Sequence, residues 1–238
     1  MAVGFSTGCF YRTDMELWSR IRLCSDLGAD AIEIGAATIE EFKKINITQQ
    51  YADELNKFKY VSIHAPWKEL SYKKDDDIDA LINKLHEISD KVNVGGIVLH
   101  WDTVKDADYL KATGLPFLIE NGDKRKGKAV MPADFKKLKK ETPFGFCLDI
   151  QHAYEHDPTM DMAKVYVDVM GDRLKEMHVS GCTKDEIHFP TYRADNSRDI
   201  QKILELELKV PKILEGLIIQ KPYFTANSEL KFIRRFEK

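Results

Sequence analysis

The amino-acid sequence predicts one α/β domain, a (β/α)₈ or TIM barrel that spans residues 1–238. Short apolar segments alternate with helical segments along the chain, at a spacing of roughly 25–30 residues. Strands that alternate with helices pair in parallel, and eight such units in 238 residues fit a closed barrel. A doubly wound open sheet is the alternative. It would carry a GxGxxG turn after its first strand, which Gly4 and Gly8 do not make.

Apolar runs closed by glycine, proline or polar residues predict the strands. These are residues 3–7, 31–35, 60–65, 95–100, 116–121, 144–150, 174–179 and 211–215. Between and after them we expect helices at residues 17–27, 38–44, 48–58, 75–94, 103–113, from 132 onward, 158–171, 196–208 and from 228 onward.

Several helices carry recognisable start signals. Thr13 and Glu16 have the spacing of a capping box before the first helix, and Pro132 suits a first helical position. The helix from Asp75 to Val94 begins with three acids, which the positive end of the helix dipole favours. Ser228 is expected to start the last helix. An apolar stripe along the 75–94 helix comprises Ile78, Leu81, Ile82, Leu85 and Ile88.

Composition narrows the class of protein. Hydrophobic residues make up 43% and charged residues 32%, which suits a globular domain with a solvated surface, and the net charge of −3 indicates neither a nucleic-acid nor a membrane coat. Four cysteines without a CxxC pair indicate reduced thiols. With no signal peptide and no apolar run of about 20 residues, we expect a cytoplasmic protein without a membrane or an obligate protein partner.

Ligand-type side chains stand at the ends of consecutive predicted strands. In a parallel barrel, the carboxyl ends of the strands meet at one mouth, where ligands bind. Imidazoles and carboxylates gathered there without a cation would be costly, and a divalent metal removes that cost. Mixed nitrogen and oxygen donors suit Zn, Mn, Fe or Co better than Ca. The strand-end residues are His64, His100, Glu120, Asp149, His178 and Glu215, and His152 and His188 follow in loops.

Each of these residues also has a structural interpretation. His64 could be a satisfied buried histidine, Asp149 a loop cap, and Glu215 a partner of Lys212. Such separate roles do not explain why ligand-type residues stand at the same position, the carboxyl end, of six consecutive strands. We therefore favour a metal site. His86 and His156 are interpreted as structural or surface residues. Cys147 is expected to lie out of register with Asp149, and Cys182 to be an ordinary loop thiol.

Several motifs together resemble one superfamily over nearly the whole chain. They are Ser62–Pro66, Leu99–His100, Ile119–Asn121, Leu148–Ala153, Met177–Ser180 and Ile213–Glu215. In this order they are similar to the xylose-isomerase-like TIM barrels, or AP endonuclease family 2. That superfamily includes endonuclease IV and many sugar isomerases and epimerases.

The resemblance implies two possible site designs. In the epimerase design, one metal is held by Glu120, Asp149, His178 and Glu215, and the two glutamates exchange the proton beside a carbonyl. In the endonuclease IV design there are three zinc ions. The first would be held by His64, His100 and Glu120, and the second would share Glu120 with Asp149, His178 and Glu215.

The third zinc site departs from the pattern of endonuclease IV. His152 and His188 are present, but the family's Asp-x-His pair is here Glu186-Ile-His188, with Asp185 one position away. Glu186 is the predicted ligand, with Asp185 as the alternative. The chain also lacks the family's usual Asn near His64 and its Pro-Leu-Gly segment after His188.

The histidines at positions 64 and 100 lead us to predict an endonuclease IV-like phosphodiester hydrolase, with abasic DNA as a candidate substrate. The alternatives are a metal-dependent sugar isomerase or epimerase acting through Glu120 and Glu215, and a barrel that binds metal and sugar without turnover. Zinc is the favoured cofactor, with one to three ions, and Mn or Co are alternatives. The substrate is expected to be a small phosphorylated compound, a sugar, or abasic DNA.

Basic and aromatic residues near the mouth are candidates for contacting the substrate. Arg12 and Arg193 could contact phosphate, as could Lys124 and Arg125 in the basic loop 123–128, for which a merely solvated loop is the alternative. Trp67 and Trp101 could stack on a sugar or base, or pack at the rim.

Overall fold

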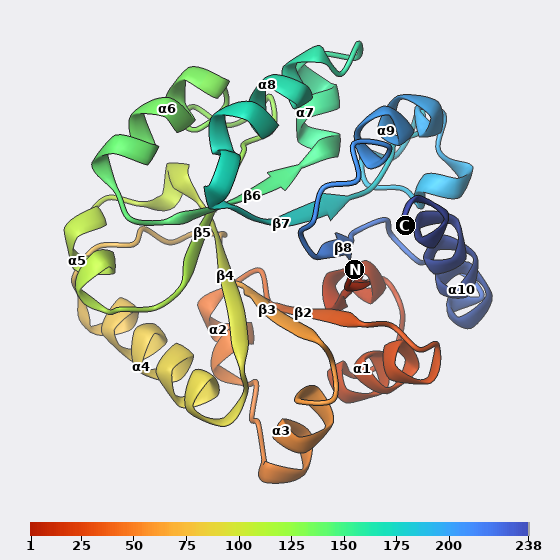
Figure 1. The fold of residues 1–238 in the computed structure, drawn as a ribbon. Helices are drawn as coiled ribbons and strands as arrows, with labels where there is room; N and C mark the ends of the chain where they lie inside the picture. Colours follow the sequence, from red (N-terminus) through yellow and green to blue (C-terminus); the bar gives the residue numbers. More distant parts are fainter. Residues whose placement is uncertain (238) are drawn as a thin grey trace.

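The computed structural model describes residues 1–237 and contains a closed barrel of eight parallel strands in chain order, ringed by helices (Figure 1). The predicted fold class is therefore confirmed. The strands are β1 (Val3–Ser6), β2 (Ala31–Gly35), β3 (Tyr60–His64), β4 (Val94–His100), β5 (Phe117–Glu120), β6 (Gly145–Asp149), β7 (Leu174–Val179) and β8 (Lys212–Leu214). The barrel closes where β1 pairs with β8, with Val3 beside Lys212.

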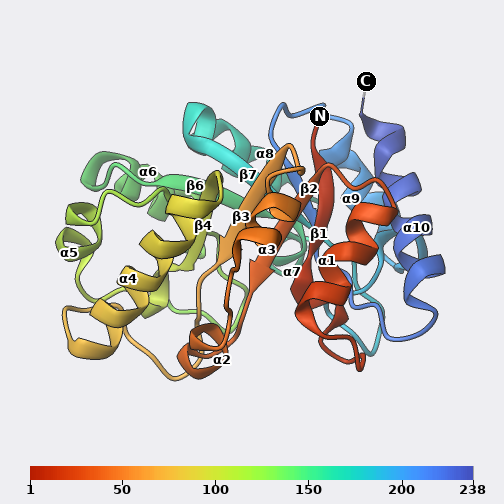
Figure 2. The same ribbon diagram turned by 90° about the horizontal axis from the view of Figure 1, so that it is seen from below.

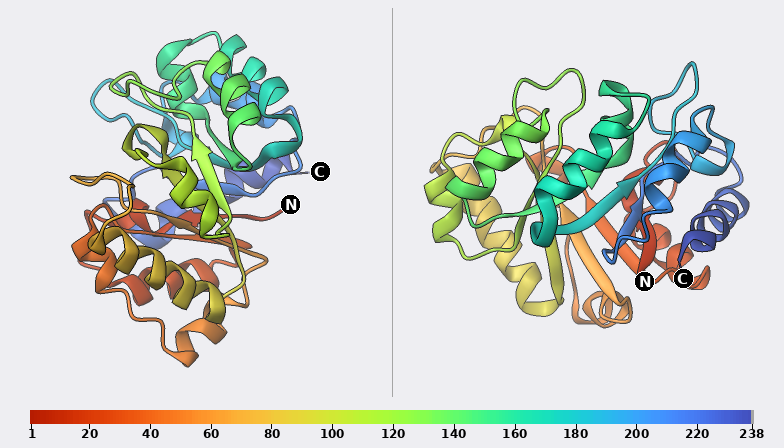
Figure 3. Two further views of the ribbon diagram at one scale, coloured as in Figure 1. Left: turned by 90° about the vertical axis from the view of Figure 1, so that its left-hand side faces the viewer. Right: turned by 45° about the horizontal axis from the view of Figure 1, so that its top comes forward.

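The α-helices lie outside the strands, as the side views show (Figures 2 and 3). They are α1 (Leu17–Asp26), α2 (Ile39–Lys43), α3 (Gln49–Leu55), α4 (Asp76–Lys91), α5 (Ala107–Ala112), α6 (Pro132–Glu141), α7 (Ile150–His156), α8 (Asp161–Met170), α9 (Ser197–Leu204) and α10 (Pro222–Ile233). Among residues 1–237, none of these helices has the length and apolar character needed to cross a membrane.

The capping box expected at Thr13 is wrong. Helix α1 begins at Leu17 after Glu16, which makes no side-chain cap. The hydroxyl of Thr13 instead donates to Phe10 O at 2.7 Å, because it is used in the preceding turn. A capping box does form at α2, where Thr38 Oγ1 accepts from Glu41 N at 3.2 Å and the Glu41 carboxylate accepts from Thr38 N.

Two other helix predictions need correction. Helix α10 begins at Pro222, so Ser228 lies inside it; proline fits the first turn because its missing N–H would be unpaired there anyway. The strand expected to reach Ile150 ends at Asp149, and the unpredicted helix α7 follows at once. Asp149 is both the last residue of β6 and the N-cap of α7, which fixes the position of His152 one turn later.

The hydrophobic core lies chiefly between barrel and helices. Phe135 of α6, for example, packs edge-on against Phe146 of β6 and Tyr166 of α8, with ring centroids 5.1 and 5.5 Å apart. Inside the barrel, a separate apolar cluster contains only Val98, Leu118 and Cys147. Most TIM barrels fill this space with branched aliphatic side chains, so the interior here leaves room for polar groups.

The expectation that Cys147 lies out of register with Asp149 is wrong. Residues two apart on a strand face the same side, so Cys147 also points into the barrel. Its Sγ lies 4.0 Å from Glu176 Oε1. All four cysteines are free thiols.

Candidate metal centre

The strand-end side chains converge into three overlapping groups, and a fourth group, Cys147, Glu176 and His178, lies deeper in the barrel. Within each group, one ligand atom per residue lies within 4.8 Å of the others. The three overlapping groups are His64, His100 and Glu120; Glu120, Asp149, His178 and Glu215; and Asp149, His152 and His188. Glu120 and Asp149 are shared between groups. Every predicted strand-end residue is therefore in place for a metal centre, and their roles as ligands remain predictions.

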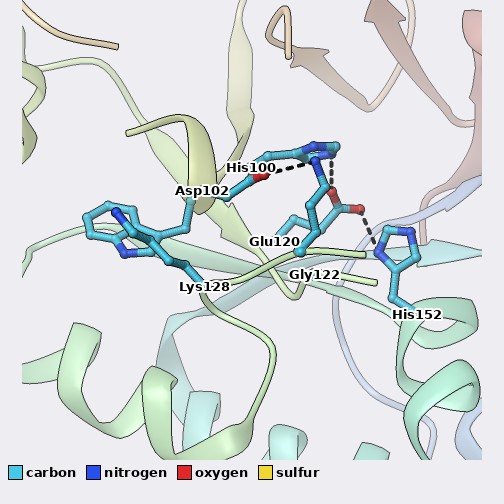
Figure 4. A pocket seen from close by; sticks show the side chains of 8 residues that line it. His100, Asp102, Glu120, Gly122, Lys128 and His152 are labelled. Carbon is cyan, nitrogen blue, oxygen red and sulfur yellow. Dashed lines mark ion pairs between the residues drawn. The ribbon is translucent and has the colours of Figure 1, made fainter. Parts of the chain in front are cut away.

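Glu120, at the end of β5, is the middle of the cluster. Its Oε2 lies 2.8 Å from His100 Nε2, and its Oε1 lies 2.8 Å from His178 Nδ1. Figure 4 shows the carboxylate between His100 and His152. Burial by itself would raise the pKa of Glu120, but the imidazoles of His100 and His178 hold it well below its ordinary value. Glu120 is thus an ionised carboxylate surrounded by nitrogen atoms.

Asp149 is held by its neighbours on both sides. Its Oδ1 accepts from the backbone N–H of His152 at 2.8 Å as the cap of α7. Asn121 accepts from Asp149 N at 2.7 Å and donates to Asp149 O at 2.8 Å, which locks the end of β6 to the residue after β5. Asp149 Oδ2 is buried, lies 3.6 Å from His152 Nδ1 and accepts no hydrogen bond from the described residues 1–237. This oxygen can bind a cation.

His178 and Glu215 complete the second group. Glu215 follows β8, and its Oε2 lies 3.4 Å from His178 Nδ1, so Glu120 and Glu215 approach the same ring nitrogen. The Glu215 side chain is 16% exposed and the Glu120 side chain 2%, so Glu215 is the more open of the two. Burial and, against the opposing effect of His178, the nearby carboxylates raise the pKa of Glu215 to about 8. Without a metal, Glu215 therefore keeps a proton to a higher pH than Glu120 does, and both carboxyl groups approach His178 Nδ1.

The third group is formed by the loop histidines with Asp149. The rings of His152 and His188 are 5.5 Å apart, and His188 Nδ1 lies 2.9 Å from Ser180 Oγ. Burial opposes protonation of His152, but Asp149 and Glu120 outweigh it and raise its pKa to about 9. Burial lowers the pKa of His188 to about 4, so its neutral ring can offer a lone pair.

Glu186 does not join these groups. Its Oε1 pairs with Arg12 Nη1 at 2.7 Å, and Asp185 is exposed. The oxygen near His152 and His188 comes instead from Asp149, which the second group also uses. Arg12, predicted to contact phosphate, and Glu186, predicted to bind metal, thus pair with each other between the loops after β1 and β7.

The other candidate substrate residues are scattered around the mouth. Trp67 packs on the histidines, 4.7 Å from the His64 ring and 5.6 Å from the His100 ring. Lys124 is exposed, Arg125 pairs with Asp123 at 2.7 Å, and Arg193 lies over the Phe189 ring. Two other lysines of the basic loop, Lys126 and Lys128, line a small pocket beside Glu120. It is formed by His100, Trp101, Asp102, Glu120, Gly122, Lys126, Lys128 and His152 (Figure 4).

Sequence reasoning missed two buried acids. Glu33 of β2 and Glu176 of β7 are both 0% exposed and lie below the mouth. Glu176 Oε1 is 2.9 Å and Glu33 Oε2 is 3.2 Å from His178 Nε2. Alternation along β7 could have revealed Glu176, because residue 176 must face the same side as residue 178.

The donor set fits a divalent transition metal. Imidazole and carboxylate donors converge from six consecutive strands, and within residues 1–237 the buried Asp149 Oδ2 accepts no hydrogen bond. Nitrogen and oxygen ligands of this kind favour Zn, Mn, Fe or Co.

Comparisons with known proteins agree with this fold. No protein-family model and no curated protein matches the sequence. Among solved structures, D-psicose 3-epimerase from Clostridium cellulolyticum has a TM-score of 0.68 at 14% identity and covers 100% of both chains. Endonuclease IV from Thermus thermophilus has a TM-score of 0.69 at 14% identity and covers 99% of this chain and 98% of its own. A probable 3-DHS dehydratase from Bacillus anthracis has a TM-score of 0.71 at 11% identity and covers 98% of each chain.

The chain therefore shares the barrel fold of these solved structures, which include an endonuclease IV and a sugar epimerase. At these identities the likeness shows the fold alone. The reaction must be argued from the side chains at the mouth.

Proposed function

We propose that this protein is a divalent-metal-dependent sugar isomerase or epimerase in which Glu120 and Glu215 move the proton beside a carbonyl. The observation that carries the proposal is the convergence of Glu120, Asp149, His178 and Glu215 within 4.8 Å at the barrel mouth. Several of the similar solved structures are described as sugar epimerases, including those of D-tagatose, D-psicose and L-ribulose type. This reverses the order of preference that the sequence motifs suggested.

The two glutamates suit opposite halves of a proton transfer. Glu120 is ionised by its histidine contacts, whereas Glu215 retains a proton to higher pH and is the more exposed. Acid–base pairs of this kind are recognised by environments that push two pKa values apart. The metal, when bound, would polarise the substrate oxygens. Glu120 would take or return the proton on one face of the carbon beside the carbonyl, and Glu215 on the opposite face.

The histidine groups support a second candidate, phosphodiester hydrolysis of the endonuclease IV type. His64 and His100 form a complete group with Glu120, as a second metal would require. Against three metals stands the sharing of Asp149, because Glu186 pairs with Arg12 and the group with His152 and His188 has no carboxylate of its own. We therefore place hydrolysis second, and binding without turnover third.

Solvent hydrogen exchange tests the leading proposal without knowledge of the sugar. Protein loaded with Mn²⁺ or Co²⁺ is incubated in D₂O with a panel of ketoses and aldoses, and NMR follows deuterium entering beside the carbonyl. Exchange with at least one sugar is expected, and Glu215→Gln should slow it by about 100-fold or more. The control Glu229→Gln changes a carboxylate that is buried elsewhere, on Thr191 and Tyr192, and should exchange normally.

Metal stoichiometry and abasic-duplex nicking decide between the candidates. One metal per chain with exchange supports isomerisation. Two or three zinc ions with nicking, lost on His64→Ala with His100→Ala, would replace it with hydrolysis. Metal binding without either activity would leave only the binding role.

A further inference from the structure

A polar layer lies directly beneath the proposed metal centre. Glu33 is in register with Ser6 of β1 and Ser62 of β3, and Glu176 is in register with Cys147 of β6. Neighbours in parallel register face the same side, and all of these side chains point inward and are buried. A TIM barrel normally places bulky aliphatic residues at this level. The unusual polarity needs a reason.

The layer is built to admit polar atoms. Gly96 faces inward next to Ser62, and a Cβ there would lie 2.8 Å from the hydroxyl of Tyr60 and 2.4 Å from Leu118 Cδ1. The missing side chain leaves space for the Tyr60 hydroxyl to enter from the bottom of β3. Within residues 1–237, this layer holds several buried polar atoms without a hydrogen-bond partner. They are Glu33 Oε1, Tyr60 Oη, Ser62 Oγ and Glu176 Oε2.

His178 connects this layer to the mouth. Its Nδ1 faces Glu120 Oε1 at 2.8 Å, and its Nε2 faces Glu176 Oε1 at 2.9 Å and Glu33 Oε2 at 3.2 Å. An imidazole that binds a metal through one nitrogen commonly donates its other N–H to a carboxylate, which fixes the ring and strengthens the donor. His178 has two carboxylates available for this contact, one from its own strand and one from across the barrel.

We propose that Glu176, supported by Glu33, positions His178 for metal binding by accepting the Nε2 hydrogen, so that Nδ1 presents its lone pair to the mouth. The proposal rests on the proposed metal centre and holds for either reaction. Glu176 lies two residues before His178 on β7, so the strand itself sets their spacing. Glu33 approaches from β2 and prevents the ring from turning away. Neither glutamate faces the substrate side, so both are positioning residues.

The test is metal affinity, measured by competition with a chromophoric chelator for Zn²⁺ on full-length variants that circular dichroism shows to be folded. Glu176→Gln keeps the shape and an acceptor oxygen but loses the charge, and should weaken binding about 10-fold or more. Glu176→Met keeps the length without an acceptor and should weaken it further. Glu33→Gln should have a smaller effect than Glu176→Gln.

Glu229→Gln is the matched control. Glu229 is also a buried glutamate, 1% exposed, but it accepts from the backbone of Thr191 and Tyr192 and makes no contact with His178. The Glu229→Gln substitution should lower the midpoint temperature of unfolding while leaving Zn²⁺ affinity unchanged. In zinc-loaded protein labelled with ¹⁵N-histidine, the His178 Nε2–H proton of the wild type should resonate far downfield and exchange slowly, because a carboxylate accepts it, and Glu176→Met should move this resonance upfield and speed its exchange.

Three outcomes would overturn the proposal. The first is a folded Glu176→Gln variant whose affinity lies within twofold of the wild type. The second is a larger loss for Glu33→Gln than for Glu176→Gln. The third is a thiolate-to-Co²⁺ absorption band that Cys147→Ser abolishes, which would mean that the metal lies below His178 instead. The Asp149→Asn variant distinguishes failure of this proposal from failure of the proposed function. Unchanged Zn²⁺ affinity in Asp149→Asn would mean that the metal does not bind at the barrel mouth at all.

Discussion

The side-chain amide of Asn121 forms two hydrogen bonds with the backbone of Asp149, one to its N–H at 2.7 Å and one to its carbonyl at 2.8 Å. Asn121 O also lies 2.9 Å from His152 Nδ1. One residue after β5 thus fixes a carboxylate and an imidazole that belong to the next strand and helix. The position of the candidate metal centre depends on this buried residue, which is not itself a candidate ligand.

Replacement of Asn121 by alanine should therefore affect both stability and metal binding. The substitution leaves the buried N–H and carbonyl of Asp149 without partners, which costs about 1–3 kcal/mol for each group. We expect a lower free energy of unfolding in urea and Zn²⁺ binding weakened by about 10-fold. Asn56→Ala is the control, since Asn56 bonds Lys91 O and Asn93 N in the same way at an exposed site. Equal affinities for the two variants would contradict this role.

A bound metal should stabilise the fold strongly. Carboxylates of Glu120, Asp149 and Glu215 lie close together, and a cation relieves their repulsion. At a free metal concentration 1,000 times Kd, the gain is about 4 kcal/mol. Differential scanning fluorimetry with EDTA and with Zn²⁺ or Mn²⁺ measures it as a shift in Tm. Asp149→Asn should abolish most of the shift, while Asp172→Asn, in an exposed pair with Lys139, should keep it. A shift retained by Asp149→Asn would place the metal elsewhere.

The metal-free protein should lose stability as pH rises from about 6.5 to about 9. The nearby carboxylates raise the pKa values of both His64 and His152 to about 9, against the effect of burial. Folded protein therefore holds protons that unfolded protein releases above about 6.5, so this stabilisation is complete below that pH and is lost as pH approaches 9. Urea unfolding in EDTA at pH 6.5 and pH 9 should differ by on the order of 3 kcal/mol. A free energy of unfolding that is constant or rises across this pH range would contradict the raised pKa values of His64 and His152.

Excess Zn²⁺ should reverse the sign of this pH dependence. Protons and metal compete for the same imidazoles, so metal affinity rises as the histidines lose their protons. The His64→Ala, His152→Ala double variant should show a weaker pH dependence in EDTA. A double variant with the wild-type slope would assign the dependence to other groups.

The Arg12–Glu186 pair should contribute little to stability. The two side chains are 40% and 30% exposed, so solvent screens the attraction between them. In a double-mutant cycle with Arg12→Ala and Glu186→Gln, measured by urea unfolding, the effects of the two substitutions should be nearly additive, and any coupling should disappear in 1 M NaCl. Strongly non-additive effects would mean that the pair holds the mouth loops together.

The sequence by itself determined the barrel and the set of strand-end residues. Alternating strands and helices predicted the closed parallel sheet, and the common register of His64, His100, Glu120, Asp149, His178 and Glu215 predicted that they would meet. This succeeded because parallel strands bring their carboxyl ends to one edge regardless of the loops. Local signals were weaker. Thr13 has capping-box spacing, but its hydroxyl is used in a turn, and Pro222 starts a helix that the sequence placed later.

Only the tertiary structure decided which partners these residues have. Glu186 looks like a ligand in sequence, yet Arg12 from the far end of the chain, 174 residues away, pairs with it. Glu33 and Glu176 look like ordinary strand residues, yet both reach His178 inside the barrel. A strand's alternation gives the side to which a residue points. The closure of the sheet decides which residue from a distant strand it meets there, because that distance depends on all eight strands together.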